Sequence, residues 1–507
     1  MKVGANKATN NSFDVVILGG GTAGWMAANI MAKRWLSLDI NITLVESLEI
    51  GSIGVGEGST PQLKGFFDFI GIDESDWMPR CHATYKNGIT FKGWSSRPGY
   101  DSYFHPFPAA TDAHAAQAFV YNCYLRRNHI DIDTHPDKYF LPAYLAKEGL
   151  GPKPDYNFPF FVSYGYHFDS RCIGDLLKNH GKKNGIIYRQ AKICEVIKSP
   201  NGNIDYVLTE DGDAISADFF VDATGFSGLL IQKTLKVPFV SFKQNLFNDS
   251  AVVLSTENAE GPNSHTVSSA MKYGWRWDIP LTNRSGSGYV YSSDFCSHDD
   301  AETELRKSLG LLDSAVSARH INMRVGRVEK HWYRNCLAVG LSQGFIEPLE
   351  ATALHLVQET VDQFIDLFEQ GNFSNKLESQ FNKIINDRFE GIRDYIVCHY
   401  HINSRKDTDY WKENAENQHI SDSLRHILST WVGGQDLTRE LHRQDIEKYY
   451  TSISWHCMLS GYGFYPNHTL KKDEKRASRF SSEHIGDFHS RCALNFKHHS
   501  VQLSALH

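Results

Sequence analysis

The sequence predicts an α/β fold, with a Rossmann-type body at the start of the chain and a mainly helical region appended to it. Residues 13–18 are a short apolar run that stops at three glycines, and residues 25–32 have helical composition. A second apolar run over residues 40–45 ends at Glu46. Strand, helix and strand in this order form a βαβ unit, which builds parallel sheets.

Later segments extend this body and then give way to helices. Buried strands are expected over residues 217–222 and 336–340. From about Thr352 onward strand patterns become scarce. Apolar residues at helical spacing predict helices over residues 354–367 and 380–393, and this spacing continues toward the end of the chain. We therefore expect a helical section laid against the α/β body.

The glycines after the first strand have the spacing of a dinucleotide site. Residues 19–24 fit GxGxxG, in which the glycines permit a tight turn, close approach of a pyrophosphate, and close packing of helix on strand. The helix N-terminus favours phosphate, and the acid that ends the second strand would accept a hydrogen bond from a ribose hydroxyl. The expected cofactor-binding residues are Gly19, Gly21, Thr22, Ala23, Gly24 and Glu46.

Two further segments favour FAD over NAD. Residues 221–225, Val-Asp-Ala-Thr-Gly, resemble the second nucleotide element of flavoproteins that bind two dinucleotides. The strand before Gly340 resembles their third element, although Leu341 stands where those proteins usually carry an Asp that contacts the ribitol. Asp222 and Gly340 therefore join the expected cofactor-binding residues, and the body is expected to be an FAD-binding, glutathione-reductase-like Rossmann fold.

Composition narrows the classes of function. The formal net charge is −7 and the isoelectric point is about 6.4, which argues against a nucleic-acid partner. No run of about 18 apolar residues occurs, so no membrane span is expected. Residues 1–11 are short and polar, unlike a secretory signal. The nine cysteines form no CxxC pair and no Cys/His cluster, so we expect reduced thiols, a cytoplasmic protein and no metal site.

Residues 274–280, Gly-Trp-Arg-Trp-Asp-Ile-Pro, are the most distinctive segment of the chain. Two tryptophans two residues apart on an extended segment point to the same side, so they either wall a cavity together or pack in the core. The segment matches the WxWxIP signature of the flavin-dependent tryptophan halogenase family, in which it lies between flavin and substrate. The resemblance implies that this wall consists of Trp275, Trp277, Ile279 and Pro280.

Other blocks resemble the same family, in the same order, over nearly the whole chain. Residues 55–61 resemble its VGExT flavin loop, which implies that Gly56 and Glu57 bind the cofactor. Residues 399–411 resemble a further block of the family. Several independent blocks in the family's order make a chance match a poor explanation.

Two of these blocks carry the residues that the resemblance implies are catalytic. Residues 85–91 resemble the segment with the family's essential lysine, here Lys86. Residues 344–352 resemble its EPLE(S/A)T motif, which places the active-site glutamate at Glu350. Each has an ordinary alternative, since a lysine is usually a solvated surface charge and Glu350 could cap the following helix.

The EPLE(S/A)T motif also implies a halide site. Backbone N–H groups of Thr352 and Ala353, near a helix N-terminus, would hold the ion. The family usually has Gly at the second position, so Ala353 leaves the ion preference open. Glu347, earlier in the motif, is expected to be structural.

The resemblance places an aromatic substrate beside these groups. His105 and Phe107 lie in a segment that resembles the one stacking on the indole of family substrates, and Trp455 lies in a C-terminal segment that the family shares. Enzymes acting on free tryptophan carry a Tyr-Tyr, Glu and Phe-Trp clamp just before that segment. Here only three residues separate Tyr449-Tyr450 from Ser454, and no Phe-Trp pair occurs. We therefore expect an indole-like or phenolic substrate rather than free tryptophan.

The resemblance further implies a reaction and its partners. Reduced FAD, O2 and a halide (chloride, bromide or iodide) would yield hypohalous acid, which Lys86 and Glu350 deliver to an electron-rich ring. No second nucleotide fingerprint for NAD(P)H is visible, so a separate flavin reductase is expected to supply FADH2. A homo-oligomer is plausible by family analogy. Two alternatives remain: a flavin-dependent aromatic monooxygenase, and a flavin-binding protein without catalysis.

We divide the chain on this basis. Residues 1–100 and 161–360 are assigned to the FAD-binding α/β body, and residues 101–160 and 361–507 to the mainly helical substrate-binding region. The polar tail after Asn467 has no predicted role.

Overall fold

The architecture is that of a computed structural model, which describes residues 12–49, 56–155, 157–257, 261–467, 469–473 and 482–506. Residues 1–11, Val55 of the expected flavin loop and part of the polar tail lie outside the described residues. Within the described ranges, no helix is long and apolar enough to cross a membrane.

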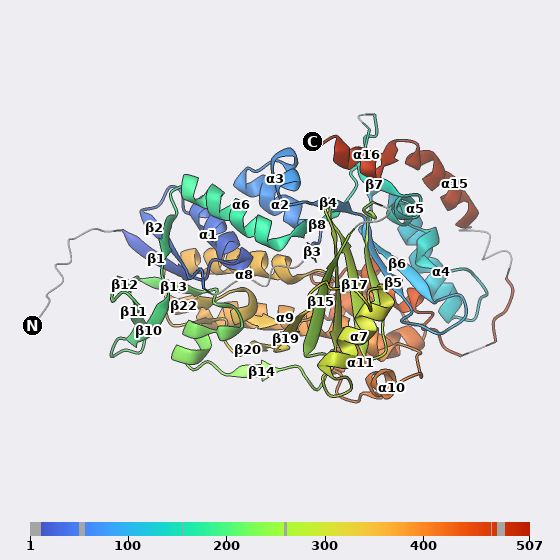
Figure 1. The fold of residues 1–507 in the computed structure, drawn as a ribbon. Coiled ribbons are helices and arrows are strands. Elements are labelled where there is room, and N and C mark those ends of the chain that lie inside the picture. The colour runs from blue at the N-terminus through green and yellow to red at the C-terminus, as the bar shows by residue number, and fades with distance from the viewer. Residues whose placement is uncertain are drawn as a thin grey trace, which may run out of the picture.

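One end of the molecule is built on a six-stranded sheet in the order β21-β22-β13-β1-β2-β9 (Figure 1). All neighbours pair in parallel except β21, which pairs with β22 in antiparallel fashion. The strands predicted from the sequence are confirmed as β1, β2, β13 and β22. The six strands are β1 (Phe13–Leu18), β2 (Ile40–Glu46), β9 (Ile187–Gln190), β13 (Phe219–Asp222), β21 (Trp332–Tyr333) and β22 (Cys336–Ala338).

The two faces of this sheet are covered by different layers. Val15 and Ile17 of β1 share a core with Trp25 of the helical layer, whereas Val16 and Leu18 share a second core with a small β-meander. Alternate residues of a strand point to opposite faces, so a fully apolar strand needs cover on both. The covering elements are α1 (Thr22–Arg34), α6 (Ser170–Lys183) and α8 (Ala353–Gln370) on one face and β10 (Ile193–Lys198), β11 (Ile204–Thr209) and β12 (Ala214–Ser216) on the other.

The other half of the molecule contains a seven-stranded sheet in the order β19-β15-β18-β17-β16-β5-β6 (Figure 1). Its pairs are antiparallel except for β16 with β5. The edge strand β6 belongs to this sheet, although the predicted boundary at residue 100 assigns it to the helical region. The strands are β5 (Gly88–Lys92), β6 (Ser102–Pro106), β15 (Ser250–Thr256), β16 (Thr266–Ala270), β17 (Gly274–Pro280), β18 (Ser285–Tyr291) and β19 (Arg319–Asn322).

Two small sheets connect these halves. The sheet β3-β8-β4 contacts β17 and β18 through β3 and contacts α6 through β8. The sheet β14-β20-β23 leads into the loop that precedes α8. Their strands are β3 (Gly56–Gly58), β4 (Thr84–Lys86), β8 (Gly165–Asp169), β14 (Phe239–Ser241), β20 (Gly326–Val328) and β23 (Gly344–Phe345).

Helices dominate the C-terminal part of the chain, as the sequence predicts. The helices expected over 354–367 and 380–393 are confirmed as α8 and α9, each longer than predicted. At the C-terminal end, β24 pairs with β7. The further elements are α4 (Ala113–Arg127), β7 (Leu150–Pro154), α9 (Glu378–His401), α11 (Asp422–Val432), α13 (Ser452–Gly461) and β24 (Phe496–His498).

Candidate functional site

The predicted dinucleotide residues converge at the N-terminus of α1. A methyl group placed on Gly19 would lie 2.1 Å from the carbonyl oxygen of Ala223, and one on Gly24 would lie 2.0 Å from the carbonyl oxygen of Gly19. One on Gly340 would lie 2.7 Å from Ala23 Cβ. A methyl group on Gly21, by contrast, would meet no atom within 4 Å. Side chains are excluded where the three segments touch, and Gly21 faces open space suited to a pyrophosphate.

The two predicted acids of this cradle differ in what they contact. Glu46, at the end of β2, accepts a hydrogen bond of 2.7 Å from Lys178 of α6 and stays partly exposed. Asp222 is fully buried, and its carboxylate accepts hydrogen bonds from the backbone N–H groups of Thr224, Leu230 and Ile231. Burial raises the pKa of Asp222. Since its oxygens are used by the chain itself, the direct contribution of Asp222 is to shape the loop beside the cradle.

The tryptophans of β17 lie on one face of the seven-stranded sheet. The Trp275 and Trp277 rings are 6.0 Å apart between centroids, and both are buried. The Trp275 indole N–H donates to Glu347 Oε2 at 2.7 Å. A methyl group on Gly288 would lie 2.1 Å from the Trp277 ring, so the bare backbone of β18 makes room for that indole. The two side chains therefore project together, as their spacing predicts.

The expected flavin loop packs against the same strand. A methyl group on Gly56 would lie 3.3 Å from Ile279 Cγ2. The carbonyl oxygen of Pro280 accepts a 2.8 Å hydrogen bond from the Thr84 hydroxyl of β4. Burial raises the pKa of Glu57, in the middle of β3. The strands carrying the flavin loop and Lys86 are thus fixed to the tryptophan wall.

Lys86 lies at the end of β4 and is 0% exposed. Its Nζ has no hydrogen-bond partner in the described part of the chain and lies 5.4 Å from the centroid of the Phe107 ring. Burial lowers the pKa of Lys86 to about 7, although the nearby charge of Glu350 opposes the shift. The alternative of a solvated surface lysine is wrong.

Glu350 is also buried but is fully paired. Its carboxylate lies 3.0 Å from His105 Nδ1 and 3.0 Å from His399 Nε2. Burial alone would raise the pKa of Glu350, but the charge and hydrogen bond of His105, with the hydrogen bond of His399, outweigh it and lower the pKa to about 2. His399 Nδ1 lies 2.8 Å from the Tyr462 hydroxyl. Glu350 is therefore an ionised carboxylate at neutral pH.

Two histidines bind Glu350, a contact that the sequence does not predict. His105, expected to stack on the substrate, has its Nδ1 bound to Glu350 and is 6% exposed. His399 was not among the predicted site residues, although it begins the family block at residues 399–411. That block was the available signal in the sequence.

The expected halide loop is held by an unusual backbone. Ala351 has a positive φ of 56°, and Thr352 is the N-cap of the 18-residue helix α8, which begins at Ala353. The Thr352 side chain makes no capping hydrogen bond, and the Glu350 carboxylate binds His105 and His399 instead of the helix terminus, so the alternative that Glu350 is a helix cap is wrong. The N–H groups of Thr352 and Ala353 lie where the helix dipole favours an anion.

Glu347 ties this loop to the tryptophan wall. One of its oxygens, Oε2, accepts hydrogen bonds from Asn248, Trp275 and Tyr400 at 3.0, 2.7 and 2.6 Å. Burial raises the pKa of Glu347. The side chain has the structural role expected of it.

Trp455 reaches Glu350 through other rings. It lies on α13 with its ring centroid 4.8 Å from that of Tyr395, edge to face. Tyr395 stacks on Tyr450 at 3.6 Å and lies 6.4 Å from the His105 ring. The predicted substrate residue Trp455 is thus part of an aromatic cluster beside the carboxylate, with Tyr395 and His105 between them.

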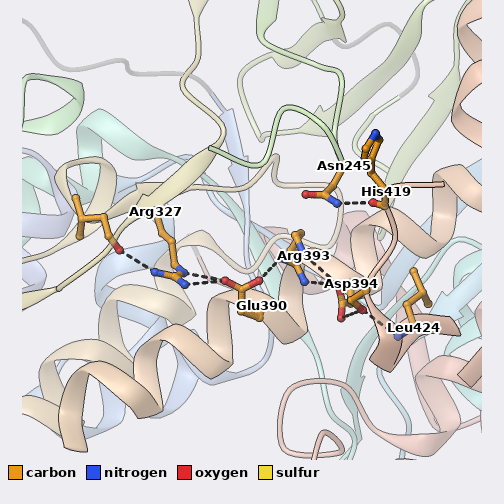
Figure 2. A network of polar contacts seen from close by, with 9 residues as sticks. Asn245, Arg327, Glu390, Arg393, Asp394, His419 and Leu424 are labelled. Atoms are coloured by element: carbon orange, nitrogen blue, oxygen red, sulfur yellow. Dashed lines mark hydrogen bonds and ion pairs between the residues drawn. The ribbon is translucent and has the colours of Figure 1, made fainter. Parts of the chain in front are cut away.

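A chain of ion pairs braces the helix that carries His399 (Figure 2). Arg327 of β20 donates to Glu390 of α9 at 2.8 and 3.0 Å, and Glu390 also pairs with Arg393. Arg393 donates to Asp394, which accepts from the Ser421 hydroxyl that caps α11. Because β20 pairs with β23 directly before the Glu350 loop, these contacts fix α9 relative to that loop.

Known proteins are similar to this chain in architecture and in sequence. The family model described as tryptophan halogenase matches residues 14–477. Tryptophan 6-halogenase SttH from Streptomyces toxytricini is 35% identical over 447 residues, covering 83% of this chain and 84% of the relative. Xcc4156, a flavin-dependent halogenase from Xanthomonas campestris, has a TM-score of 0.84 at 31% identity and covers 98% of both chains.

A third similarity is to the crystal structure of a tryptophan halogenase from Shewanella frigidimarina, with a TM-score of 0.85, 29% identity and coverage of 98% of this chain and 97% of that one. The predicted flavoprotein-type Rossmann body is confirmed by these structures. Similarity over nearly the full length, in sequence and in fold, shows that this chain belongs to the tryptophan halogenase family of flavin-dependent enzymes.

Proposed function

We propose that this enzyme halogenates an electron-rich aromatic ring, indole-like or phenolic. The observation that carries the proposal is the pair of buried groups in one site. Lys86 offers an amine without a hydrogen-bond partner in the described chain, and Glu350 offers a carboxylate kept ionised by two histidines. An amine that can hold or transfer an electrophilic halogen and a base that can receive a ring proton are the groups this reaction needs.

FAD fits the cradle at the N-terminus of α1. The open space at Gly21, the exclusion of side chains at Gly19 and Gly340, and the carboxylate of Glu46 match a dinucleotide with its pyrophosphate at a helix terminus. When bound in its reduced form, FAD would donate two electrons to O2, which then serves as the oxidant that converts the halide to hypohalous acid. The N–H groups of Thr352 and Ala353 would hold the halide.

The chain's own residues then direct the halogen. Lys86 binds the hypohalous acid, and Phe107 with the neighbouring rings holds the substrate carbon close to it, so that proximity selects the position. As the carbon–halogen bond forms, the oxygen–halogen bond breaks. The ionised Glu350 stabilises the cationic ring and receives its proton, which leaves with the hydroxide as water.

The shape of the C-terminal segment favours a substrate other than free tryptophan. Tyr450 is stacked on Tyr395, and Tyr449 packs over Gly391 on α9. The sequence has no Phe-Trp pair between these tyrosines and Ser454 that would complete a clamp for an amino acid. We assign substrate binding to residues 101–160, which include β6, and to residues 361–507, and flavin binding to residues 1–100 and 161–360.

A separate flavin reductase supplies the reduced cofactor, and a small aromatic molecule is the second partner. The decisive experiment combines the protein with FAD, a reductase, NADH, O2 and each halide, and offers a panel of indoles and phenols with mass spectrometry as readout. Halogenated products that require halide support the proposal. Hydroxylated products, or rapid NADH oxidation without a reductase, would contradict it.

A further inference from the structure

A chain of hydrogen bonds links two strands of the sheet β3-β8-β4, one of which carries Lys86, to two strands of the seven-stranded sheet. The Thr84 hydroxyl donates to the carbonyl oxygen of Pro280 at 2.8 Å. Thr84 Oγ1 also lies 2.8 Å from His167 Nδ1, and His167 Nε2 lies 2.9 Å from Thr266 Oγ1. Thr84 and His167 are 0% exposed and Thr266 is 8% exposed. Four buried residues from four strands are thus linked to one another.

The direction of each bond in this chain follows from the chemistry of its members. Thr84 gives its only hydrogen to a carbonyl oxygen, so the hydrogen between Thr84 and His167 must come from Nδ1. Burial, reinforced by the charge of Lys86, lowers the pKa of His167 well below its usual value, so the ring is neutral and Nε2 is an acceptor. The Thr266 hydroxyl therefore donates to His167, and its oxygen is left with lone pairs only.

That oxygen and the Lys86 amine both face Gly58. A methyl group on Gly58 would lie 3.2 Å from Lys86 Nζ, 3.5 Å from Thr266 Oγ1 and 3.7 Å from Ala351 Cβ. Lys86 Nζ is a fully buried donor whose hydrogens go unused by any described residue. A fixed acceptor and an unused donor that both face Gly58 form a site for a molecule that carries a hydroxyl group.

We propose that Thr266 and Lys86 together bind hypohalous acid, with its O–H donating to Thr266 and its oxygen accepting from Lys86. This inference rests on the proposed function. His167 is a positioning residue, because it holds the Thr266 hydrogen away from the ligand. With the O–H end fixed, the halogen is the end that remains for the substrate.

The first test compares Thr266→Val, which keeps the shape but removes the acceptor, with Thr266→Ser, which keeps the hydroxyl. Loss of one hydrogen bond to the oxidant should increase its escape by about tenfold. A diffusible diketone that traps free hypohalous acid measures this escape, relative to reduced flavin consumed. We expect Thr266→Val to raise trap halogenation and lower product, while Thr266→Ser stays near the parent enzyme. Equal partition between trap and product in all three proteins would overturn the proposal.

A second test does not depend on halogenation. Nitrogen NMR of protein labelled with 15N-histidine, with His167→Gln to assign the signal, reports which ring nitrogen carries hydrogen. We expect hydrogen on Nδ1 of His167 and a shift of its Nε2 signal in Thr266→Val. Hydrogen on Nε2 would reverse the chain and overturn the inference even if halogenation occurs. Failure of the parent enzyme to halogenate with this tautomer present would instead count against the proposed function.

Discussion

Lys86 and Glu350 are equally buried in one site, yet the chain treats them in opposite ways. No described side chain or backbone group bonds to Lys86 Nζ, whereas Glu350 receives hydrogen bonds from His105 and His399. Burial lowers the pKa of Lys86 to about 7, and at Glu350 the two histidines outweigh burial and lower the pKa to about 2. One group is kept ready to change its proton state and its partner, while the other is a permanent charge.

The largest effect should follow removal of the unpaired amine. In Lys86→Met the halogen can no longer be held beside the substrate, so we expect product formation to fall by about 10²–10⁴-fold, the range for loss of a positioned catalytic group. Single-turnover assays with pre-reduced FAD measure this. Reoxidation of the flavin should continue, because Lys86 acts after that step.

A matched control is Lys92→Met, which removes an exposed lysine one strand away. It should leave product formation unchanged. Similar losses in both variants would mean that the effect of Lys86→Met is on folding and not on the reaction.

The same comparison predicts opposite effects on stability. Lys86 has a lower pKa folded, about 7, than its ordinary 10.5. The buried charge therefore destabilises the fold by its full amount below pH 7, and this destabilisation disappears as the pH rises to 10.5. Lys86→Met should raise the free energy of unfolding by about 2–5 kcal/mol near pH 7, as measured by urea denaturation, with a smaller gain at higher pH.

Glu350→Gln should change stability in the other direction. Its folded pKa of about 2 lies below the ordinary 4.5, so the carboxylate stabilises the fold above pH 4.5 and this contribution is lost as pH falls toward 2. The variant should be less stable than the parent at neutral pH and approach it in acid. A variant that is more stable at neutral pH would refute the view of Glu350 as a well-paired charge.

These two groups also mark how far the sequence carries the prediction. The motifs around Lys86 and Glu350 indicate their importance, and the apolar runs of β1 and β2 predict the Rossmann sheet. Neither reveals His399 or His167, because a single buried histidine has no characteristic spacing. Their roles come from contacts between segments that are distant in the sequence: α9 with the Glu350 loop, and β8 with β16.

The seven-stranded sheet escaped prediction for a related reason. Its strands pair segments as distant in the sequence as β5 and β16. Long-range register is not encoded in local periodicity. The tryptophan spacing on β17 was the exception, since two large rings on one face are visible in the sequence itself.

Substitutions of Glu347 should act mainly on the stability of the fold. Glu347→Leu leaves the buried donors of Asn248, Trp275 and Tyr400 without their acceptor, so we expect a loss of about 2–4 kcal/mol in the free energy of unfolding. Glu347→Gln keeps one acceptor oxygen and should lose about half as much. Equal losses would mean that the volume of the side chain, not its hydrogen bonds, holds the wall.

The smallest effect should come from the ion pairs of Figure 2. They brace the helix that carries His399, which binds Glu350, and so bear on Glu350 and not on Lys86. Glu390 is 31% exposed and bonds to Arg327 and Arg393. Partly solvated pairs contribute little, so Glu390→Gln should lower the free energy of unfolding by about 1 kcal/mol or less. Because salt screens such pairs, the difference should shrink at high ionic strength. Lys383→Gln, which removes an exposed pair on the same helix, is the control. If Glu390→Gln abolished halogenation while Lys383→Gln did not, the buried contacts at Glu350 would not be enough to place His399, and the ion pairs on α9 would also be needed.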